Sequence, residues 1–239
     1  MNLEKDLEKL EEKLEEIENP KMDMVYTGLG VVLLAIASLY LFRVVAPQPL
    51  PEFLILPVPF SAQAPTNNWS RNEDCEETSI TMANAFLTNT TQDKLPAGAA
   101  QEAINNLKKW EEANLGYNAN TGVGATIKMG EGAFGLKIEP RYNFTEEELK
   151  KELVKGHPIL LPINARLLGS PQYKDSGPTY HMVVVRGFKG QIFIVNDPGT
   201  NNGDGNEYTF RVLKNAAADW NQTTMKMDPT RKIALIVSR

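Results

Sequence analysis

An uncharged apolar run near the N-terminus limits what this chain can fold into more than any other feature. Residues 24–42 carry no charged side chain and include Val31-Val32-Leu33-Leu34-Ala35-Ile36-Ala37. As a helix rising about 1.5 Å per residue, this run would extend about 28 Å, close to the thickness of the hydrocarbon core of a bilayer. We therefore predict a transmembrane helix over residues 24–45.

A cleaved signal peptide is the alternative to a membrane anchor, since Val44-Val45-Ala46 resembles a cleavage site. The apolar run is longer than the usual signal-peptide core of about 7–15 residues, and the region before it is long and acidic. We favour an uncleaved anchor. Lysines that include Lys9, Lys13 and Lys21 precede the run, and after Arg43 the next basic residue is Arg71. The excess of positive charge on the cytoplasmic side of membrane helices then predicts a cytoplasmic N-terminus and an extracytoplasmic main domain.

Residues 1–20 carry apolar side chains at heptad spacing in a background of Glu and Lys. The spacing is 4, 3, 4, 3 over Leu3, Leu7, Leu10, Leu14 and Ile17. This pattern predicts an amphipathic, coiled-coil-like helix, which Asn19-Pro20 ends. Two heptads are short for an independent coiled coil. A solvated helix at the membrane surface and a homo-oligomer formed through this helix both remain open.

The charge distribution argues against nucleic-acid binding. Residues 1–23 hold four lysines and nine acidic residues, and the acids and bases of the remaining chain balance. No basic patch emerges that could neutralise phosphates. With 42% hydrophobic residues, the chain is long enough to bury a sizeable core. We place a stiff proline-rich spacer over residues 46–59, with the linker proper at 46–52 and a single folded domain at 53–239.

The patterns within this domain predict helices first and strands later. We expect helices at about 75–87, 98–113 and 145–155, and strands at 158–164, 181–188, 191–196, 207–210 and 231–237. This order is typical of the α+β class. A run of glycines between residues 116 and 135 lacks a phosphate-binding lysine pattern, so we interpret it as a flexible loop that could line a cleft.

Three residues offer the components of nucleophilic catalysis. Cys75, the single cysteine, begins a predicted helix, His181 opens a β-branched strand, and Asp197 follows the next strand. A helix N-terminus and a nearby imidazolium both lower a thiol pKa, which makes the thiolate available as a nucleophile. The alternatives are that Cys75 is a small buried hydrophobic residue and that His181 is a satisfied polar residue. The residues alone leave both interpretations open.

Several segments, in order, resemble the stand-alone branch of the bacteriocin-processing cysteine peptidases, the C-thirty-nine-like peptidase family. They are Val58-Pro59-Phe60-Ser61-Ala62-Gln63-Ala64-Pro65, Asn68-Trp69, Cys75-Glu76-Glu77-Thr78-Ser79, Gly156-His157-Pro158-Ile159, Tyr180-His181-Met182-Val183-Val184-Val185-Arg186-Gly187-Phe188 and Val195-Asn196-Asp197-Pro198-Gly199-Thr200. The resemblance covers about residues 54–237.

This resemblance implies a papain-like cysteine peptidase fold and a set of site residues. Cys75 matches the nucleophile, His181 the base and Asp197 the acid that orients the base. Gln63 matches the side chain that donates to the oxyanion. Adjacent residues of a strand point to opposite faces, so only one of Asn196 and Asp197 can face His181. A papain-type amide at Asn196 is the alternative orienting group.

The resulting hypothesis is a membrane-anchored cysteine peptidase that hydrolyses peptides or proteins outside the cytoplasm. The best-understood members of the family are fused to export transporters and cut leader peptides after a glycine pair, whereas this chain shows no nucleotide-binding domain, so that substrate does not carry over. A catalytically silent binding module is one alternative. A transpeptidase or amidase that uses the same nucleophile is another.

No cofactor or metal is expected. A single cysteine excludes a zinc site built from cysteines, and the spacing in the loop 197–206 lacks the terminal glutamate of a known calcium motif, so a polar hairpin is expected there. His157 lies between a predicted helix and a predicted strand and is interpreted as a turn residue.

Overall fold

The computed structural model describes residues 8–9, 29–36, 38, 49–69, 73–117, 119–173 and 176–239. The chain divides into two units, residues 1–49 and residues 50–239. In the first unit, residues 8–9, 29–36 and 38 are helical. The predicted heptad helix at 1–20 and membrane span at 24–45 otherwise lie outside the described residues. Within the described part of the chain, no helix has both the length and the apolar character needed to cross a bilayer.

A seven-stranded antiparallel sheet forms the centre of the second unit. Six of its strands follow the order β2-β9-β3-β4-β5-β6, and β1 pairs with one end of β4. All side chains of β3 and nearly all of β4 are buried, which explains why their sequences are continuous apolar runs rather than alternating ones. The strands are β1 (Phe53–Ile55), β2 (Lys137–Tyr142), β3 (Ile159–Ile163), β4 (His181–Lys189), β5 (Ile192–Asn196), β6 (Asn206–Thr209) and β9 (Ile233–Ser238).

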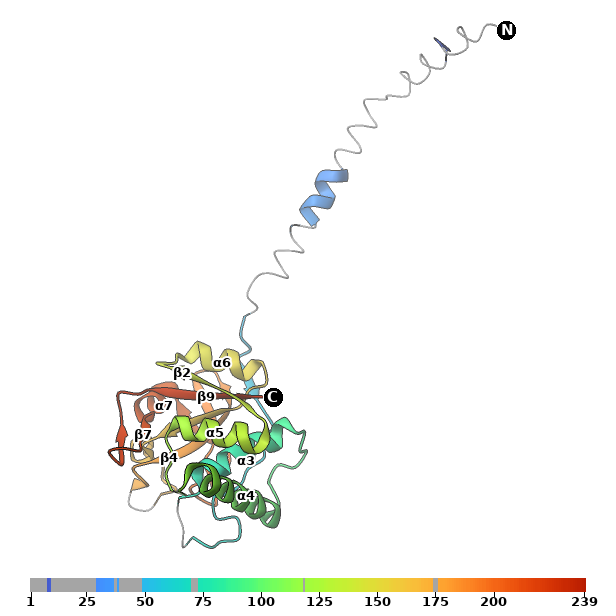
Figure 1. Ribbon diagram of the computed structural model, residues 1–239. Coiled ribbons are helices and arrows are strands. Elements are labelled where there is room, and N and C mark those ends of the chain that lie inside the picture. The colour runs from blue at the N-terminus through green and yellow to red at the C-terminus, as the bar shows by residue number, and fades with distance from the viewer. Residues whose placement is uncertain are drawn as a thin grey trace. The chain divides into compact units, whose positions relative to one another are not determined.

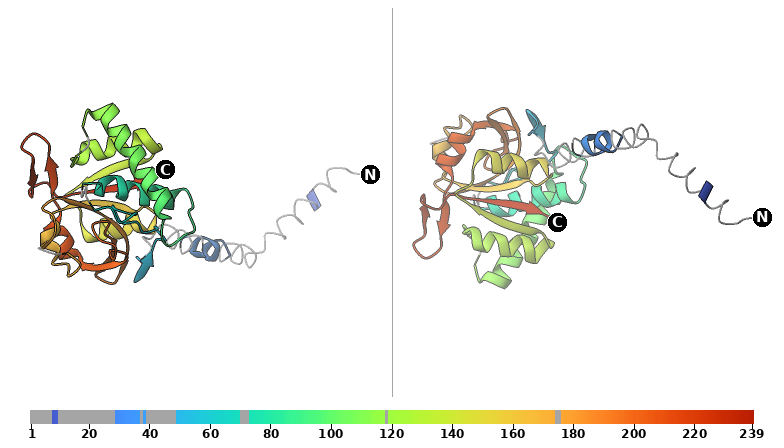
Figure 2. Two further views of the ribbon diagram at one scale, coloured as in Figure 1. Left: turned by 90° about the horizontal axis from the view of Figure 1, so that it is seen from below. Right: turned by 90° about the horizontal axis from the view of Figure 1, so that it is seen from above.

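Helices cover both faces of this sheet. In Figure 1, α3, α4 and α5 lie on one side of β9, and α6 lies on the other; Figure 2 shows the same separation from above. The helices are α3 (Cys75–Leu87), α4 (Ala97–Leu115), α5 (Val123–Phe134), α6 (Glu146–Val154) and α7 (Phe210–Ala216), with a short 3₁₀ helix, η1, at Ala165–Leu168. A separate hairpin pairs β7 (Asp219–Asn221) with β8 (Lys226–Asp228). The expectation of a domain that mixes helices with a sheet is confirmed.

Helix α3 is the central helix of the domain. It packs against β4 on one side and against α4 on the other. Its first nine residues, 75–83, are all buried, including polar and acidic ones. A helix buried all round has no solvent-facing stripe. Any charged residue near its N-terminus must therefore find its partners inside the protein.

The glycine-rich stretch is the main correction to the predicted elements. Residues 123–134, expected as a flexible loop, form helix α5. Several of its glycines, though not Gly124, allow close packing: a Cβ on Gly122 would lie 2.5 Å from the carbonyl oxygen of Trp220, and one on Gly132 would lie 2.3 Å from the ring of Trp110. This helix was not predicted because glycine has a low helix propensity, and the stretch contains several glycines.

The order of elements differs from the prediction in two further ways. Strand β2 lies between α5 and α6, and α7 lies between β6 and β7, so helices and strands alternate more than expected. The proline-rich stretch belongs partly to the domain, because Leu56, Val58 and Phe60 are buried in the core. The backbone N–H of Leu56 also donates to the carbonyl of Arg186 in β4, at 2.8 Å. The spacer predicted up to residue 59 therefore ends before β1.

Candidate active site

Cys75 is the first residue of α3 and is 2% exposed. The residue before it, Asp74, forms a 2.6 Å ion pair with Lys108 of α4. This ion pair links the start of α3 to the neighbouring helix.

The thiol of Cys75 lies between a carboxyl group and the start of β4. Its Sγ donates to Oε2 of Glu76 at 2.9 Å, and the backbone N–H of Met182 donates to the sulfur. Burial raises the pKa of Cys75 well above its ordinary value, the nearby charge of Glu76 raises it further, and the Met182 N–H only partly opposes them. The low pKa expected from the helix N-terminus is therefore wrong for this arrangement, because burial and a carboxylate outweigh the helix dipole.

A cluster of three buried acidic residues lies behind the thiol. Oε1 of Glu76 accepts from the backbone N–H of Thr121 at 2.7 Å. Burial raises the pKa of both Glu77 and Glu111, that of Glu111 to about 7, and neither carboxyl oxygen of Glu111 has a hydrogen-bond partner in the described part of the chain. Sequence reasoning missed this cluster. The signal was present, since two acidic residues directly follow Cys75 in a segment that is otherwise apolar or neutral.

His181 and Asp197 form a buried pair. His181 begins β4 and Asp197 follows the end of β5, two neighbouring antiparallel strands. Nε2 of His181 lies 2.7 Å from Oδ1 of Asp197. Among the described residues, the other ring nitrogen, Nδ1, has no hydrogen-bond partner within the protein. With Nε2 directed at the carboxylate, Nδ1 is the ring nitrogen left to exchange a proton with another group, which is the arrangement that a general base needs.

The carboxylate of Asp197 is surrounded by donors. Besides His181, the hydroxyl of Tyr173 lies 2.7 and 2.8 Å from its two oxygens, and the backbone N–H of Gly199 donates at 2.9 Å. Burial by itself would raise the pKa of Asp197, but His181 and these donors together hold it below its ordinary value. Asp197 therefore stays ionised although it is fully buried.

Asn196, the alternative orienting residue, has other partners. Its amide Nδ2 donates to the carbonyl of Val58 at 3.0 Å, and its Oδ1 accepts from the backbone N–H of Gly205 at 3.3 Å. The side chain thus connects the start of the domain to the loop after β5. It makes no hydrogen bond to His181 in the described structure.

Gln63 lies close to this pair. Its backbone N–H donates to the carbonyl of Pro198, the residue after Asp197, at 2.8 Å. Two residues earlier, the backbone N–H of Ser61 contacts the sulfur of Met82 in α3 at 3.2 Å. The segment that carries Gln63 is thus attached both to the Asp197 loop and to the helix that carries Cys75.

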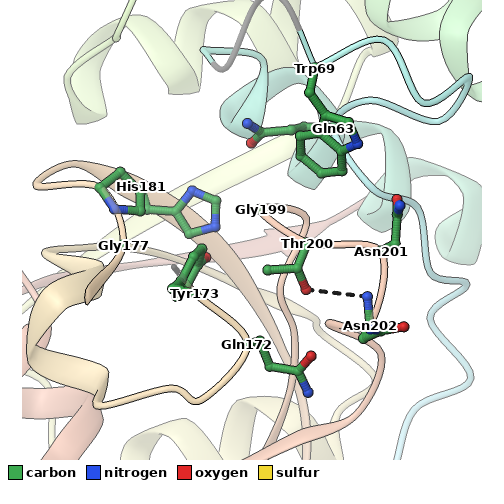
Figure 3. Close-up of a pocket in the computed structure, with 11 residues that line it drawn as sticks. Gln63, Trp69, Gln172, Tyr173, Gly177, His181, Gly199, Thr200, Asn201 and Asn202 are labelled. Carbon is green, nitrogen blue, oxygen red and sulfur yellow. Dashed lines mark hydrogen bonds between the residues drawn. The ribbon is translucent and has the colours of Figure 1, made fainter. Parts of the chain in front are cut away.

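Gln63 and His181 line one cavity of about 780 Å³. Figure 3 shows Gln63 and Trp69 on one side of it, with Tyr173 and His181 on another. The loop after Asp197 supplies Gly199, Thr200, Asn201 and Asn202 to its wall. Cys75, which is 2% exposed, is not among the residues that line this cavity. Neither Trp69 nor Tyr173 was predicted as a site residue: Trp69 lies in a segment that carries the family resemblance but was given no role, and Tyr173 comes from a loop without a local motif.

The remaining sequence candidates lie elsewhere. His157 follows the end of α6, where its Nδ1 lies 2.9 Å from Oε2 of Glu152, so it takes part in a local side-chain contact at the turn. In the loop 197–206, Asp204 pairs with Arg186 at 3.1 Å. Over the residues that the structure describes, no three His, Cys, Asp or Glu side chains are grouped to hold a metal ion.

A mixed helix-and-sheet domain with a helix-borne cysteine beside a buried His–Asp pair has the components of a thiol peptidase. The chain belongs to the Peptidase_C39 like family, whose model matches residues 55–227. A search of curated proteins found no match.

Two solved structures are similar to this chain. One is a crystal structure of a proposed C39-like peptidase from Bacillus anthracis, with 18% identity over 79% of this chain and 98% of that one, and a TM-score of 0.50. The other is a double glycine motif protease from an AMS/PCAT transporter in complex with the leader peptide, with 17% identity over 77% and 92% of the two chains and a TM-score of 0.43. At this identity, the first comparison supports the fold alone.

Proposed function

We propose that this protein is a cysteine peptidase in which Cys75 is the nucleophile, His181 the general base and acid, and Asp197 the group that orients His181. The observation that carries the proposal is the 2.7 Å contact between Nε2 of His181 and Oδ1 of the buried Asp197. His181 is the first residue of β4, and the next residue of that strand, Met182, donates its backbone N–H to the Cys75 sulfur. Membership of the Peptidase_C39 like family supports the same chemistry.

The proposed reaction follows from the free nitrogen of His181. Nδ1 takes the proton from Sγ of Cys75 as the sulfur attacks the scissile carbonyl. The oxyanion receives hydrogen bonds from the side-chain amide of Gln63 and the backbone N–H of Cys75. His181 then gives its proton to the leaving amine as the C–N bond breaks, which leaves a thioester on Cys75. Water, deprotonated by His181, hydrolyses the thioester to the acid and restores the thiol.

The contact between Cys75 and Glu76 defines the resting state in this proposal. Because the thiol pKa is raised, the resting sulfur keeps its proton and directs it to Glu76 rather than existing as a thiolate beside imidazolium. Attack then requires the thiol to turn toward His181 and transfer the proton as the new bond forms.

We further propose that the domain is anchored to a membrane through residues 24–45, with the N-terminus in the cytoplasm. The support is the uncharged run at residues 24–42 and the lysines that precede it. The substrates would then be peptides or proteins outside the cytoplasm.

One observation favours a second function. Cys75 is 2% exposed and does not line the cavity, as expected for a binding module in which the thiol serves only packing. Such a module would hold peptides in the cavity without cleaving them.

The test uses the full-length protein in detergent and a pool of internally quenched peptides that samples all residue pairs at the scissile bond. Cleavage by the wild type that is lost in Cys75→Ala and His181→Ala supports the peptidase, provided that thermal melts show both variants folded. Peptides that bind the wild type and Cys75→Ala equally, with no cleavage by either, would establish the binding module instead.

A further inference from the structure

Tyr173 makes the closest contacts to Asp197 outside the proposed catalytic set. It lies in the loop between η1 and β4, and its hydroxyl lies 2.7 and 2.8 Å from the two carboxylate oxygens. Its ring also meets the His181 ring edge to face, with centroids 6.1 Å apart and planes at 87°. One side chain thus contacts both members of the His–Asp pair.

These contacts restrict the carboxylate of Asp197 in a way that His181 alone cannot. A carboxylate held at one oxygen can rotate about its bond to Cβ, whereas donors at both oxygens prevent that rotation. Burial and the charge of Asp197 raise the pKa of Tyr173, so its hydroxyl remains a neutral donor throughout the physiological pH range. The hydroxyl can therefore donate to Asp197 at any physiological pH.

Gly199 provides the space for this arrangement. It lies in the turn after β5, two residues beyond Asp197. A Cβ on Gly199 would lie 2.4 Å from the Tyr173 hydroxyl and 3.0 Å from Cε1 and Nε2 of His181. The absence of a side chain lets Tyr173, His181 and Asp197 pack together, and the Gly199 N–H supplies the third donor to the carboxylate.

We propose that Tyr173 is a positioning residue that fixes the Asp197 carboxylate and, through it, the orientation and tautomer of His181. The proposal rests on the proposed function, in which His181 transfers protons to and from Cys75. Tyr173 does not need to touch the reacting atoms for this role. Two other roles must be distinguished from this one. Tyr173 lines the cavity and could contact the substrate, or it could only stabilise the loop in which it lies.

The conservative variant Tyr173→Phe separates these roles, because it removes only the hydroxyl and keeps the ring. Removal of a hydrogen bond to a charged group predicts a kcat about 10- to 100-fold lower, with KM changed less than about twofold. A substrate contact would instead raise KM with kcat unchanged. The matched control is Tyr208→Phe: the Tyr208 hydroxyl interacts with Ser170 of the same loop and with Asn206, and it feels the charge of Asp197 without a described hydrogen bond to it. This control should leave kcat near the wild-type value.

A second readout does not require peptidase activity. The chain has two histidines, His157 and His181, so ¹⁵N-histidine labelling of the full-length protein gives two imidazole signals. In the wild type, His181 should remain the Nε2–H tautomer. In Tyr173→Phe, loss of a donor should raise the pKa of Asp197, so that the acid-side transition in the His181 nitrogen shifts moves upward by about one pH unit. His157, which pairs with Glu152, is the internal reference.

The two readouts distinguish failure of this inference from failure of the proposed function. Unchanged His181 shifts in Tyr173→Phe, or the same change in Tyr208→Phe, would overturn the positioning role whether or not the protein cleaves peptides. A His181 signal that changes in Tyr173→Phe, together with a wild type that cleaves no peptide, would support the positioning role and contradict the peptidase.

Discussion

At the scale of single residues, the contact between Cys75 and Glu76 sets the reactivity of the thiol. Glu76 accepts from the sulfur through one oxygen and from Thr121 through the other. Its charge raises the pKa of Cys75, in addition to the larger effect of burial. Alkylation of the folded protein by iodoacetamide should therefore be slow at pH 7 and accelerate as the pH rises.

Glu76→Gln tests this directly. The amide can still accept from Thr121 but carries no charge and can donate to the sulfur, so the thiolate gains stability. We expect Cys75 to be alkylated several-fold to about tenfold faster at pH 7.5. Glu73→Gln, an exposed neighbour, is the matched control and should have no effect. Equal rates in the wild type and Glu76→Gln would show that Glu76 does not control the thiol.

The buried carboxyl of Glu111 predicts a pH-dependent stability. Burial raises its pKa from 4.5 to about 7, so the folded state binds its proton more tightly than the unfolded state. The stability that this proton contributes is fully present below pH 4.5 and is lost as the pH rises through about 7. Glu111→Gln should raise Tm by about 3–6 °C at pH 8 and much less at pH 5. Glu102→Gln, exposed on the same helix, should give no such difference; equal shifts at both pH values would contradict the assignment.

At the scale of elements, α5 shows how the helix next to the site is held in place. Gly122 caps it, and the backbone N–H of Val123 donates to Asp219 of β7 at 2.9 Å. The start of α5 is thereby fixed close to Thr121, which binds Glu76. The packing at Gly122 therefore helps to position Thr121, and through it Glu76, which contacts the proposed nucleophile Cys75.

Two glycine variants test this packing. Gly122→Ala would place a Cβ 2.5 Å from a backbone oxygen, so it should destabilise the protein by about 1–3 kcal/mol. Gly124→Ala meets nothing within 4 Å and should stabilise the helix by up to about 1 kcal/mol, because alanine is the better helix former. Chemical denaturation of both variants gives the measurement. If both variants shift stability in the same direction, close approach to β7 does not explain Gly122.

The elements also show where sequence reasoning succeeds. The helix at 75–87 has the predicted bounds, and the strands that begin near His181 and end at Asn196 are recognisable because apolar β-branched runs are buried on both faces. Helix α5 was missed because the glycines at positions such as Gly122 and Gly132 are required by side chains and backbone that are distant in sequence. Tyr173 and Glu111 were missed for the same reason, since their partners Asp197 and Glu77 lie 24 and 34 residues away.

At the scale of the whole molecule, the proposed topology places the second unit outside the cytoplasm. Protease added to intact cells or spheroplasts should remove the domain after residue 46 and leave the N-terminal segment protected. A domain that resists protease until the membrane is lysed would reverse the proposed orientation. Recovery of soluble protein that begins at Pro47 would instead show that the apolar segment is a cleaved signal.

The central claim is that Cys75 acts through a histidine that Asp197 orients. The most direct measurement is kcat/KM for Asp197→Ala and Asn196→Ala on a peptide that the wild type cleaves, with folding checked by thermal melt. Asp197→Ala should lower kcat/KM by about 10²- to 10⁴-fold, because His181 loses its orienting partner. Asn196→Ala should act mainly on stability, since its amide binds Val58 and Gly205. A folded Asp197→Ala with full activity, alongside a folded but inactive Asn196→Ala, would contradict the account.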